Sequence, residues 1–415
     1  MELKRVVITG LGALTPIGNN VNQYWNSLIH GVSGASAITY FNASKFKTQF
    51  ACELKNFNAL DFIDKKELRK YDDYTTYGLV AAQEAISLSG INLDEVNKDE
   101  IGVIWGSGIG GIKTFSEEVE NYVLGDGTPR FNPFFIPKMI ADIAAGVISI
   151  KYGFRGPNFA TVSACASSSN AILDAFNYIR LGQANVFICG GSEASITPAG
   201  VGGFNAIKAL STNNDHPTQA SRPFDSERNG FVLGEGAGAI ILEEYEHAKN
   251  RNAIILAEVI GGGLSADAHH ITAPHPEGAG AIQVMNKALK SAHLEPEKID
   301  YINVHGTSTG LGDLAEMKAI KKVFGKSVYD LNISSTKSMT GHLLGAAGAI
   351  ESVACIMALK NGIIPPTINL KNLDPELDEK INYTAGSAQN RVVNYALCNT
   401  FGFGGHNASI IFKKY

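Results

Sequence analysis

The chain has 415 residues, of which 45% are hydrophobic and 18% are charged, and it contains 44 glycines. This length and composition predict an α/β protein with many tight turns and either two cores or one duplicated core. The formal net charge of −5 argues against non-specific nucleic-acid binding, which requires a basic surface. No stretch approaches about 18 uninterrupted apolar residues, so we expect no membrane span.

The cysteines and the N-terminus indicate the compartment. The five cysteines are scattered without a C-x-x-C pair, at Cys52, Cys165, Cys189, Cys355 and Cys398. This spacing argues against a zinc site, and the odd number favours a reducing compartment. The N-terminus enters an apolar strand at once, without the long apolar region and small-residue cleavage site of a signal peptide. We therefore expect a cytoplasmic protein.

Two glycine-rich stretches imitate nucleotide-binding motifs. A strand predicted over residues 5–10 leads into Gly10-Leu11-Gly12, which we interpret as a turn. A third glycine is missing there, and Pro16 would break the helix that a dinucleotide site requires. The stretch 106–111 has the wrong spacing to the following lysine for a phosphate loop. We expect a flexible turn beside a pocket at 106–111 and no nucleotide site at either stretch.

A basic cluster lies on a predicted helix over residues 64–70. Its cationic side chains include Lys66, Arg69 and Lys70. Such a run is either a solvated helix face or, in a chain that is acidic overall, a local docking site for an acidic partner. The residues alone leave both interpretations open.

Residues 161–172 carry a candidate nucleophile. An apolar, β-branched approach leads into small residues, then Cys165, then a helix-forming tail, which predicts a strand, a turn and a helix start. A thiol at such a turn lies beside unpaired N–H groups and the positive end of the helix dipole, and both favour the reactive thiolate. The small neighbours leave room for a substrate carbonyl. For an isolated cysteine, burial in the core is the alternative.

The pattern restarts after a charged helix around residues 243–251. Residues 254–263 repeat the opening sequence of a strand that runs into glycines, and residues 396–405 echo the approach to the candidate nucleophile. This order predicts two related α/β units, 1–250 and 251–415. Each unit would bury a sheet between helix layers.

Two histidine motifs lie in the second unit. His305 follows a predicted strand over residues 301–304, and His342 opens a helix predicted over residues 343–359. A single histidine at a strand end is more often structural, but two that are embedded in small polar residues point to catalysis. Lys337 stands in an apolar, turn-rich context, where an ammonium group requires a partner such as Glu351. An exposed loop lysine is the alternative.

These residues together resemble a known family. The ordered set resembles the condensing enzymes of the thiolase superfamily, and among them the elongating β-ketoacyl-[acyl-carrier-protein] synthases of type II. The likeness covers essentially the whole chain. It rests on the segments 6–18, 106–111, 161–169, 222–225, 230–238, 305–309, 337–348 and 401–407. The resemblance implies a five-layered αβαβα thiolase fold from two duplicated halves.

The resemblance also implies a reaction, the decarboxylative condensation of fatty acid elongation. Cys165 would take an acyl group from acyl carrier protein, while the backbone N–H groups of Cys165 and Phe403 hold the oxyanion. Malonyl-carrier protein would then lose CO2, and the enolate would attack the acyl-enzyme. His305 and His342 would stabilise the enolate as N–H donors, and Lys337 would orient and polarise the site. Neither a redox cofactor nor a catalytic metal is required.

The same resemblance assigns supporting residues. The side chains expected to contact substrate are Thr307 and Thr309 at the phosphopantetheine arm, Phe403 as a gate, Phe401, and Ile109 and Phe204 in the acyl tunnel. The residues expected to meet the acidic carrier protein are Lys66, Arg69, Lys70 and Lys208. The family forms homodimers, in which Phe134 and Phe135 would reach the partner's tunnel. A structural monovalent cation is implied near Asn303, Glu351 and Asn399.

The chain departs from the family pattern at two positions. Gly310 stands where the family commonly has proline, which would loosen that loop, and His406 stands where some relatives carry threonine. We interpret His406 as structural. Acyl length, unsaturation and the identity of the carrier depend on packing that the sequence does not reveal.

Other members of the superfamily are the main alternatives. A biosynthetic thiolase would use a second cysteine within the last glycine-rich loop, whereas Cys398 lies before it. Priming synthases lack the motif of Lys337 and His342, and an inactive partner subunit would lack the nucleophile. A ketosynthase of a polyketide or specialised-lipid pathway shares every catalytic residue and remains an alternative.

Overall fold

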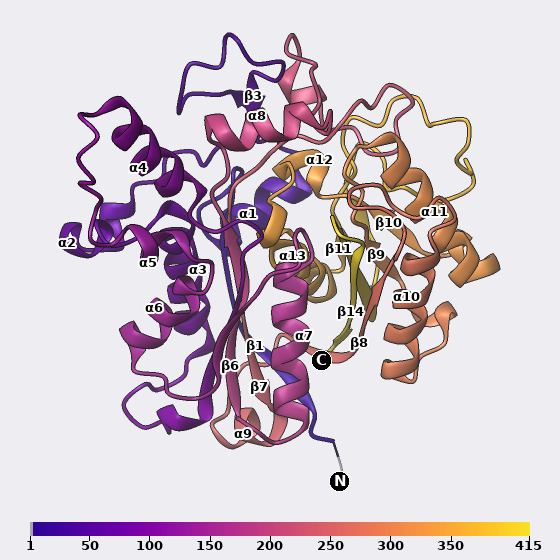
Figure 1. The fold of residues 1–415 in the computed structure, drawn as a ribbon. Coiled ribbons are helices and arrows are strands. Elements are labelled where there is room, and N and C mark those ends of the chain that lie inside the picture. Colours follow the sequence, from indigo (N-terminus) through magenta and orange to yellow (C-terminus); the bar gives the residue numbers. More distant parts are fainter. Residues whose placement is uncertain (1–2) are drawn as a thin grey trace.

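The protein is organised around one continuous sheet (Figure 1). In the computed structural model, which describes residues 3–415, ten strands lie in the order β10-β9-β13-β14-β8-β1-β7-β6-β4-β5. The strands of the first half are β1 (Val6–Leu14), β4 (Ile101–Gly106), β5 (Asn158–Thr161), β6 (Val186–Glu193) and β7 (Gly236–Glu244). The strands of the second half are β8 (Ala257–Ala266), β9 (Tyr301–Asn303), β10 (Asn332–Ser334), β13 (Tyr395–Gly402) and β14 (His406–Lys414).

The two halves share one topology. The first half has the order β5-β4-β6-β7-β1, and the second has the order β10-β9-β13-β14-β8. When the strands of each half are numbered along the chain, both orders read third, second, fourth, fifth, first. The halves meet where β1 pairs antiparallel with β8, from Val6 opposite Val259 to Ile8 opposite Ala257. The predicted duplication of an α/β unit is confirmed.

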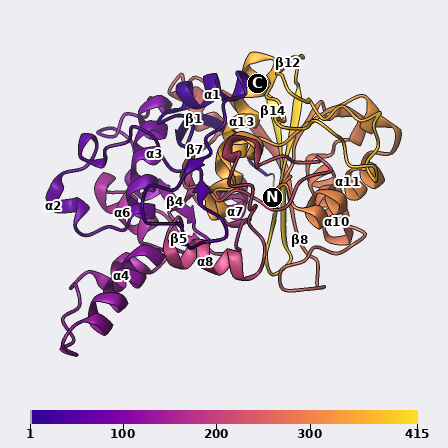
Figure 2. The same cartoon turned by 90° about the horizontal axis from the view of Figure 1, so that it is seen from above.

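Helices cover both faces of each half-sheet (Figures 1 and 2). The outer helices of the first half are α3 (Asp73–Ser89) and α6 (Ile143–Tyr152). The central helices are α7 (Ser167–Arg180) and α13 (Ala347–Asn361), and the outer helices of the second half are α10 (Ala279–Ala292) and α11 (Gly310–Phe324). The arrangement is the expected five-layered αβαβα fold.

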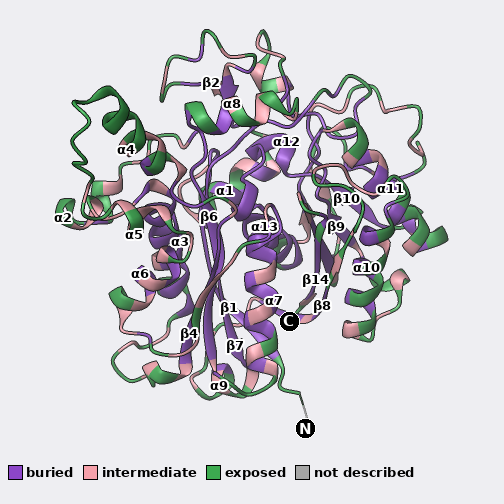
Figure 3. Ribbon diagram, in the orientation of Figure 1, coloured by how far each residue is buried: buried purple, intermediate pink, exposed green. Residues whose placement is uncertain are grey.

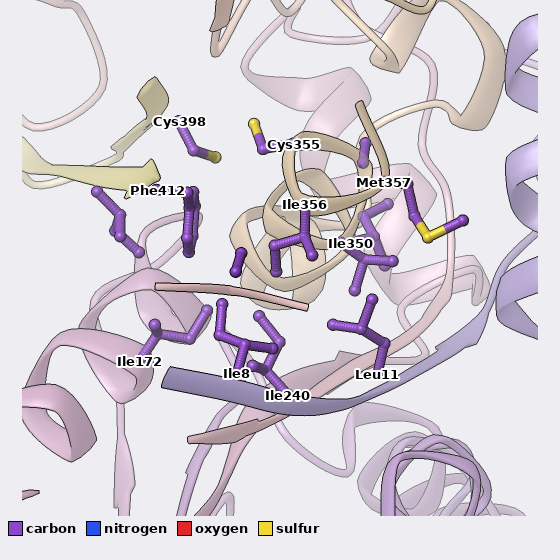
Figure 4. Close-up of a cluster of buried hydrophobic side chains, with 14 of the residues drawn as sticks. Ile8, Leu11, Ile172, Ile240, Ile350, Cys355, Ile356, Met357, Cys398 and Phe412 are labelled. Atoms are coloured by element: carbon purple, nitrogen blue, oxygen red, sulfur yellow. The ribbon is translucent and has the colours of Figure 1, made fainter. Parts of the chain in front are cut away.

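Helix α13 lies at the centre of the core. Its Ile350 and Ile356 pack in one cluster with Ile8 of β1 and Ile240 of β7, and all four are at most 1% exposed (Figure 4). Because α13 is enclosed by both half-sheets, it is buried on all sides from Ala347 to Leu359 and is mostly apolar. The stretch Leu344–Asn361 is long and apolar enough to cross a membrane by length and composition alone, but 89% of it is buried inside the protein. It is accounted for as a core helix.

The turn predicted at Gly10-Leu11-Gly12 is wrong, because β1 runs straight through it to Leu14. The glycines are there for a close approach by α3. A Cβ atom added at Gly10 would lie 2.1 Å from the carbonyl oxygen of Ala85, and one at Gly12 would lie 1.9 Å from that of Ala81. Helix and strand pack in direct backbone contact, which a larger residue would prevent.

The remaining elements surround this frame. The helices are α1 (Val21–Ile29), α2 (Lys65–Leu68), α4 (Ile112–Leu124), α5 (Phe135–Met139), α8 (Pro198–Ala206), α9 (Tyr245–Asn250) and α12 (Lys337–Thr340). Two small two-stranded sheets pair β2 (Ser36–Ala37) with β3 (Phe50–Ala51) and β11 (Ile363–Ile364) with β12 (Gln389–Asn390). The short 3-10 turns are η1 (Ala59–Asp61), η2 (Lys98–Glu100), η3 (Pro217–Gln219), η4 (Pro296–Lys298), η5 (Gly325–Tyr329) and η6 (Leu344–Ala346). Helix α4 projects from the body and is largely exposed, whereas the sheet and α13 are buried (Figures 2 and 3).

Candidate active site

Cys165 occupies the turn between β5 and α7, as the sequence predicts. Ala164 has a φ of 51°, in the left-handed region that alanine rarely adopts. The Ser167 hydroxyl stabilises this conformation, because it accepts from Ser163 N at 2.9 Å and donates to Ala164 O at 2.6 Å. The turn therefore fixes the position of the thiol just before the N-terminus of a 14-residue helix.

His342 lies directly against the thiol. Its Nε2 is 3.0 Å from Cys165 Sγ. The helix predicted to start at residue 343 begins only at Ala347, so His342 stands in the turn between α12 and η6. That turn is held on both sides, because His342 N donates to Val232 O at 2.7 Å and Gly234 N donates to His342 O at 3.0 Å. The two halves thus each supply one member of a cysteine–histidine pair.

His305 completes a group of three. It follows β9, and its ring lies 5.3 Å from that of His342, centre to centre, at an interplanar angle of 85°. One side-chain atom each of Cys165, His305 and His342 falls within a mutual distance of 4.8 Å. The Glu316 carboxylate positions the backbone here, accepting from His305 N at 2.9 Å and Gly306 N at 2.8 Å.

Lys337 and Glu351 form a buried ion pair beside this group. Their side chains are 2% and 1% exposed. The predicted partner of Lys337 is confirmed, and the alternative of an exposed loop lysine is wrong. Burial raises the pKa of Glu351, and the Lys337 ammonium opposes that rise.

Burial also determines the resting charges of Cys165, His305 and His342. It raises the pKa of Cys165 to about 12, although Lys337 and the backbone N–H group of Phe403 oppose the rise. The pKa values of His305 and His342 lie well below the usual range, because of burial and the nearby Lys337 ammonium. The expected resting thiolate is therefore wrong for this structure. The site holds a thiol and two neutral imidazoles, and the thiol proton has an acceptor in His342.

A cavity of about 510 Å³ opens onto these groups. Its lining includes the predicted residues Cys165, His305, His342, Thr307, Thr309, Phe401, Phe403, Ile109, Phe204 and Lys208. Lys337 lies behind this lining, 1% exposed. The hydroxyls of Thr307 and Thr309 are 3.0 Å apart on the same wall. Nine predicted substrate and catalytic residues thus share one chamber with one predicted docking residue.

The loop around Phe403 contains glycines that allow its backbone to change conformation. Phe403 faces Phe204 across the cavity, with 6.5 Å between the ring centres. The following Gly404 and Gly405 have φ values of 84° and 75°, which glycine adopts without strain. A change of backbone conformation at these two residues would swing the Phe403 ring.

Other predicted residues lie away from the cavity. Lys66, Arg69 and Lys70 are on or next to α2, outside the cavity lining, and Lys70 forms an ion pair with Glu67 at 2.7 Å. His406 is exposed at the start of β14 and is also outside the lining, in line with a structural role.

Two of the three residues expected near a cation have an oxygen to offer. Among the described residues, Asn303 Oδ1 and Glu351 Oε2 are buried without a hydrogen-bond partner. Asn399 Oδ1 instead accepts from Ser409 Oγ at 2.6 Å. The two unpartnered oxygens are the hard ligands that a monovalent cation prefers, and Asn399 would have to give up its present bond to join them.

Sequence reasoning missed two residues that shape the loop after His305. One is Glu316, described above, and the other is Arg228, whose side chain is 2% exposed. Arg228 Nε donates to Thr309 O at 3.2 Å, and Nη2 donates to Gly310 O at 3.0 Å. Both side chains are buried in the structure, but their sequence neighbours Glu227 and Lys318 are exposed, so no local pattern in the sequence singles the two residues out.

The arrangement suits acyl transfer to sulfur. When Cys165 attacks a thioester carbonyl, its proton can pass to His342 Nε2 without any large movement. The backbone N–H groups of Cys165 and Phe403 act on the thiol, because both lower its pKa. His305 and His342, as neutral imidazoles, can donate N–H bonds to a second oxygen in the same cavity.

Comparison with known proteins agrees with this chemistry. Residues 3–248 match the β-ketoacyl synthase N-terminal domain and residues 256–371 match the C-terminal domain. The 3-oxoacyl-[acyl-carrier-protein] synthase 2 of Synechocystis sp. is 49% identical over 415 residues, which are 100% of this chain and 99% of that protein.

Solved structures add two further similarities. The ishigamide ketosynthase/chain length factor has a TM-score of 0.93 at 32% identity, with both chains fully covered. The type II polyketide ketosynthase AntDE, solved with its acyl carrier protein AntF, has a TM-score of 0.88 at 32% identity, also over both full chains. With its thiolase fold and full-length match to condensing enzymes, the chain belongs to the β-ketoacyl synthase family.

Proposed function

We propose that this enzyme condenses malonyl and acyl groups carried on acyl carrier protein, with Cys165 as the nucleophile, and so elongates fatty acids as a 3-oxoacyl-[acyl-carrier-protein] synthase. The observation that carries the proposal is the 3.0 Å contact between Cys165 Sγ and His342 Nε2 in a cavity that His305 shares. The full-length relative from Synechocystis, at 49% identity, supports the same substrates.

The first half-reaction loads the enzyme. Cys165 Sγ attacks the thioester carbonyl, its proton passes to His342 Nε2, and the N–H groups of Cys165 and Phe403 hold the oxyanion. Collapse of the tetrahedral intermediate expels the phosphopantetheine thiolate, which takes the proton back from His342. The acyl chain is left on sulfur.

The second half-reaction forms the carbon–carbon bond. The malonyl carboxylate leaves as CO2, and its bonding electrons become an enolate whose oxygen accepts N–H bonds from His305 and from the His342 tautomer that carries its proton on Nε2. The enolate carbon attacks the acyl carbonyl, and the bond between Cys165 Sγ and that carbonyl breaks to release a 3-oxoacyl thioester two carbons longer. Cys165 leaves as a thiolate and takes up one proton from solvent, which restores the resting thiol. Lys337 does not line the cavity, so its ammonium acts through the field that keeps both imidazoles neutral.

The cavity lining supports the roles expected for the substrate residues. Thr307 and Thr309 would bond the phosphopantetheine arm, and Phe403 would gate the acyl chamber. Ile109 and Phe204 would contact the chain, with Phe401 beside His305 at 5.8 Å between ring centres. Every step balances with the substrates, one proton from solvent and these side chains, so the proposal requires neither a redox cofactor nor a catalytic metal.

The carrier protein would dock at the basic residues. Lys208 lines the cavity, and Lys66, Arg69 and Lys70 form the separate cluster at α2. A ketosynthase relative has been solved with its acyl carrier protein, which supports a carrier as partner here.

We also propose a homodimer. Strand β5 is an edge of the sheet, and α4 and α5 carry exposed apolar side chains, including Phe115, Phe134 and Ile136. A second copy would cover such a surface. We place the protein in the cytoplasm, which fits five cysteines that are all free thiols within the described residues.

The test is intact-protein mass after mixing with acyl-carrier protein. Wild type should gain one acyl mass, and Cys165→Ala should gain none. Cys189→Ala is the matched control, because Cys189 is also buried but lies in β6, outside the cavity lining, and this variant should load normally. Added malonyl-carrier protein should discharge the acyl-enzyme as a 3-oxoacyl product. No mass gain with any chain length would overturn the proposal.

A polyketide or specialised-lipid ketosynthase is the second candidate. It is favoured by the two solved relatives at 32% identity over the full chain, of which one is a ketosynthase/chain length factor and the other a type II polyketide ketosynthase. The product separates the two functions. A fatty acid enzyme should accept saturated acyl chains in preference to 3-oxoacyl chains, and a polyketide enzyme should extend its own 3-oxoacyl product again.

A further inference from the structure

A buried carboxylate links two loops of the site. Glu193, the last residue of β6, is 0% exposed and accepts four hydrogen bonds. Its Oε1 accepts from Ser107 Oγ and Ile109 N, both at 3.2 Å. Its Oε2 accepts from Gly108 N at 2.8 Å and from Gly345 N at 3.0 Å. One side chain therefore receives donors from two segments more than 200 residues apart in sequence.

Each segment carries a residue of the site. The loop after β4 presents Ile109 to the cavity, and the turn before α13 carries His342 and presents Leu344. The two segments touch, since a Cβ atom added at Gly345 would lie 2.2 Å from Gly108 N. The Glu193 carboxylate hydrogen-bonds to both segments where they touch, so it links them directly.

The surroundings of Glu193 suit an anion that only accepts. Three of its partners are backbone N–H groups, and the fourth, the Ser107 hydroxyl, accepts from Gly110 N at 3.1 Å and so donates to the carboxylate. A protonated carboxyl would point its own hydrogen at one of these donors. Burial raises the pKa of Glu193 to about 7, and the bonds from Gly108 N and Gly345 N oppose the rise.

We propose that Glu193 is a positioning residue for the proposed condensation: it holds the Ile109 loop against the His342 turn and thereby sets which acyl chains load onto Cys165. This inference rests on the proposed function. Glu193 does not line the cavity, so it acts only through the segments that it holds.

Glu193→Gln tests the link, because an amide has one accepting oxygen and one donating NH2 group. The oxygen can retain the two shorter bonds, from Gly108 N and Gly345 N, and the NH2 group then faces the other two partners. The Ser107 hydroxyl can rotate and accept, but Ile109 N–H loses its acceptor in the protein. The substitution therefore loosens the acyl-cavity loop and leaves the His342 turn in place.

Two rates are measured. The first is the rate of acyl-enzyme formation by intact mass, over saturated chains from short to long, and the second is malonyl decarboxylation, which requires His305 and His342. We expect Glu193→Gln to slow loading of the longest chains by about tenfold relative to the shortest, which is about 1.4 kcal/mol in activation free energy. Decarboxylation should stay within about twofold of wild type, a split that a general loss of structure would not produce.

Glu84→Gln is the matched control. Its carboxylate also accepts two backbone bonds, from Ala13 N and Val21 N at 2.9 Å each, and lies outside the cavity lining. It should leave the chain-length profile unchanged. Ser107→Ala is the second variant, which removes one donor from the Glu193 carboxylate and should shift the profile in the same direction by less. If Glu193→Gln does not fold, Ser107→Ala decides.

Two results would overturn the inference. One is a folded Glu193→Gln enzyme with the wild-type chain-length profile of loading. The other is an enzyme in which loading slows equally for every chain length and decarboxylation slows as well. Failure of the proposed function has a different signature, since wild type itself would then form no acyl-enzyme at Cys165.

Discussion

A single substitution at Gly310 should make the loop around this residue more ordered. It is the first residue of α11, where the fixed φ of proline fits a helix and the missing N–H group is not needed. Among the described residues, Gly310 N donates no hydrogen bond, and nothing lies within 4 Å of an added Cβ atom. The preceding Thr309 has φ −104° and ψ 142°, the extended conformation that a following proline favours. Gly310→Pro should therefore stabilise the loop that carries Thr307 and Thr309.

The expected gain is about 0.4–1 kcal/mol, mostly from lower entropy of the unfolded loop. With an unfolding entropy of roughly 2.1 cal/mol/K per residue, such a gain shifts Tm by only about 1 °C in a chain of this length. Hydrogen exchange is the sharper assay, because the same free energy slows local opening about two- to fivefold. The peptide to follow covers Thr309–Phe324, and acyl loading should not fall.

Gly312→Ala serves as the control of opposite sign. A Cβ atom there would lie 2.5 Å from Thr309 Oγ1, so exchange should become faster. If Gly310→Pro speeds exchange, or impairs loading by acyl-carrier protein, then the loop has a conformation other than the one described, and the argument from its backbone angles is refuted.

Three further predictions concern the buried charges and the docking surface. Lys337→Ala should lower the free energy of unfolding by about 3–5 kcal/mol, because Glu351 is left buried without its partner, and urea titration should show partial recovery when Glu351→Gln is added. Malonyl decarboxylation should be flat from about pH 6 to pH 8, because the lowered pKa values of His305 and His342 keep both rings neutral above them; a rate that falls as pH rises through that range would show that an imidazolium is required. Arg69→Glu should raise KM for acyl-carrier protein, and this rise should become smaller with added salt. A charge reversal on α9 should leave KM unchanged.

The catalytic set could be predicted because its residues are chemically rare in their settings. Two histidines and a lysine among small polar residues, together with a cysteine at a strand-to-helix turn, have few structural explanations. The structure brings Cys165, His305 and His342 into one cavity, with Lys337 behind them. Their roles remain proposals until the acyl-enzyme is measured.

The charge state of the nucleophile could not be predicted in the same way. Local sequence shows the helix N-terminus beside Cys165, which favours thiolate, but the opposing effect comes from burial by distant segments. Phe231 and Leu344, for example, line the same cavity and belong to other parts of the chain. Desolvation depends on tertiary packing, and here it is the largest influence on the pKa of the thiol.

Glycine was ambiguous for a similar reason. The spacing of Gly10 and Gly12 predicts a turn, but both lie within β1 because α3 leaves no room for a side chain. A turn and a close contact with a helix both fit the same sequence, and only the position of the neighbouring helix distinguishes them. The role of Glu193 could not be predicted from the sequence, because its four hydrogen-bond partners come from two remote segments. The boundary between the units, near residue 250, remains our proposal.

The pairing of β1 with β8 has a consequence for synthesis on the ribosome. The first half emerges with β1 as an unpaired edge and with the apolar face of α7 uncovered, since β8 and α13 are encoded later. At about 5–20 residues per second, the remaining 165 residues (415 minus 250) take roughly 8–33 s to appear. During that interval the nascent chain exposes an unpaired strand edge and apolar side chains of an incomplete core. Early shielding by a chaperone would therefore govern how much active enzyme a cell obtains from each message.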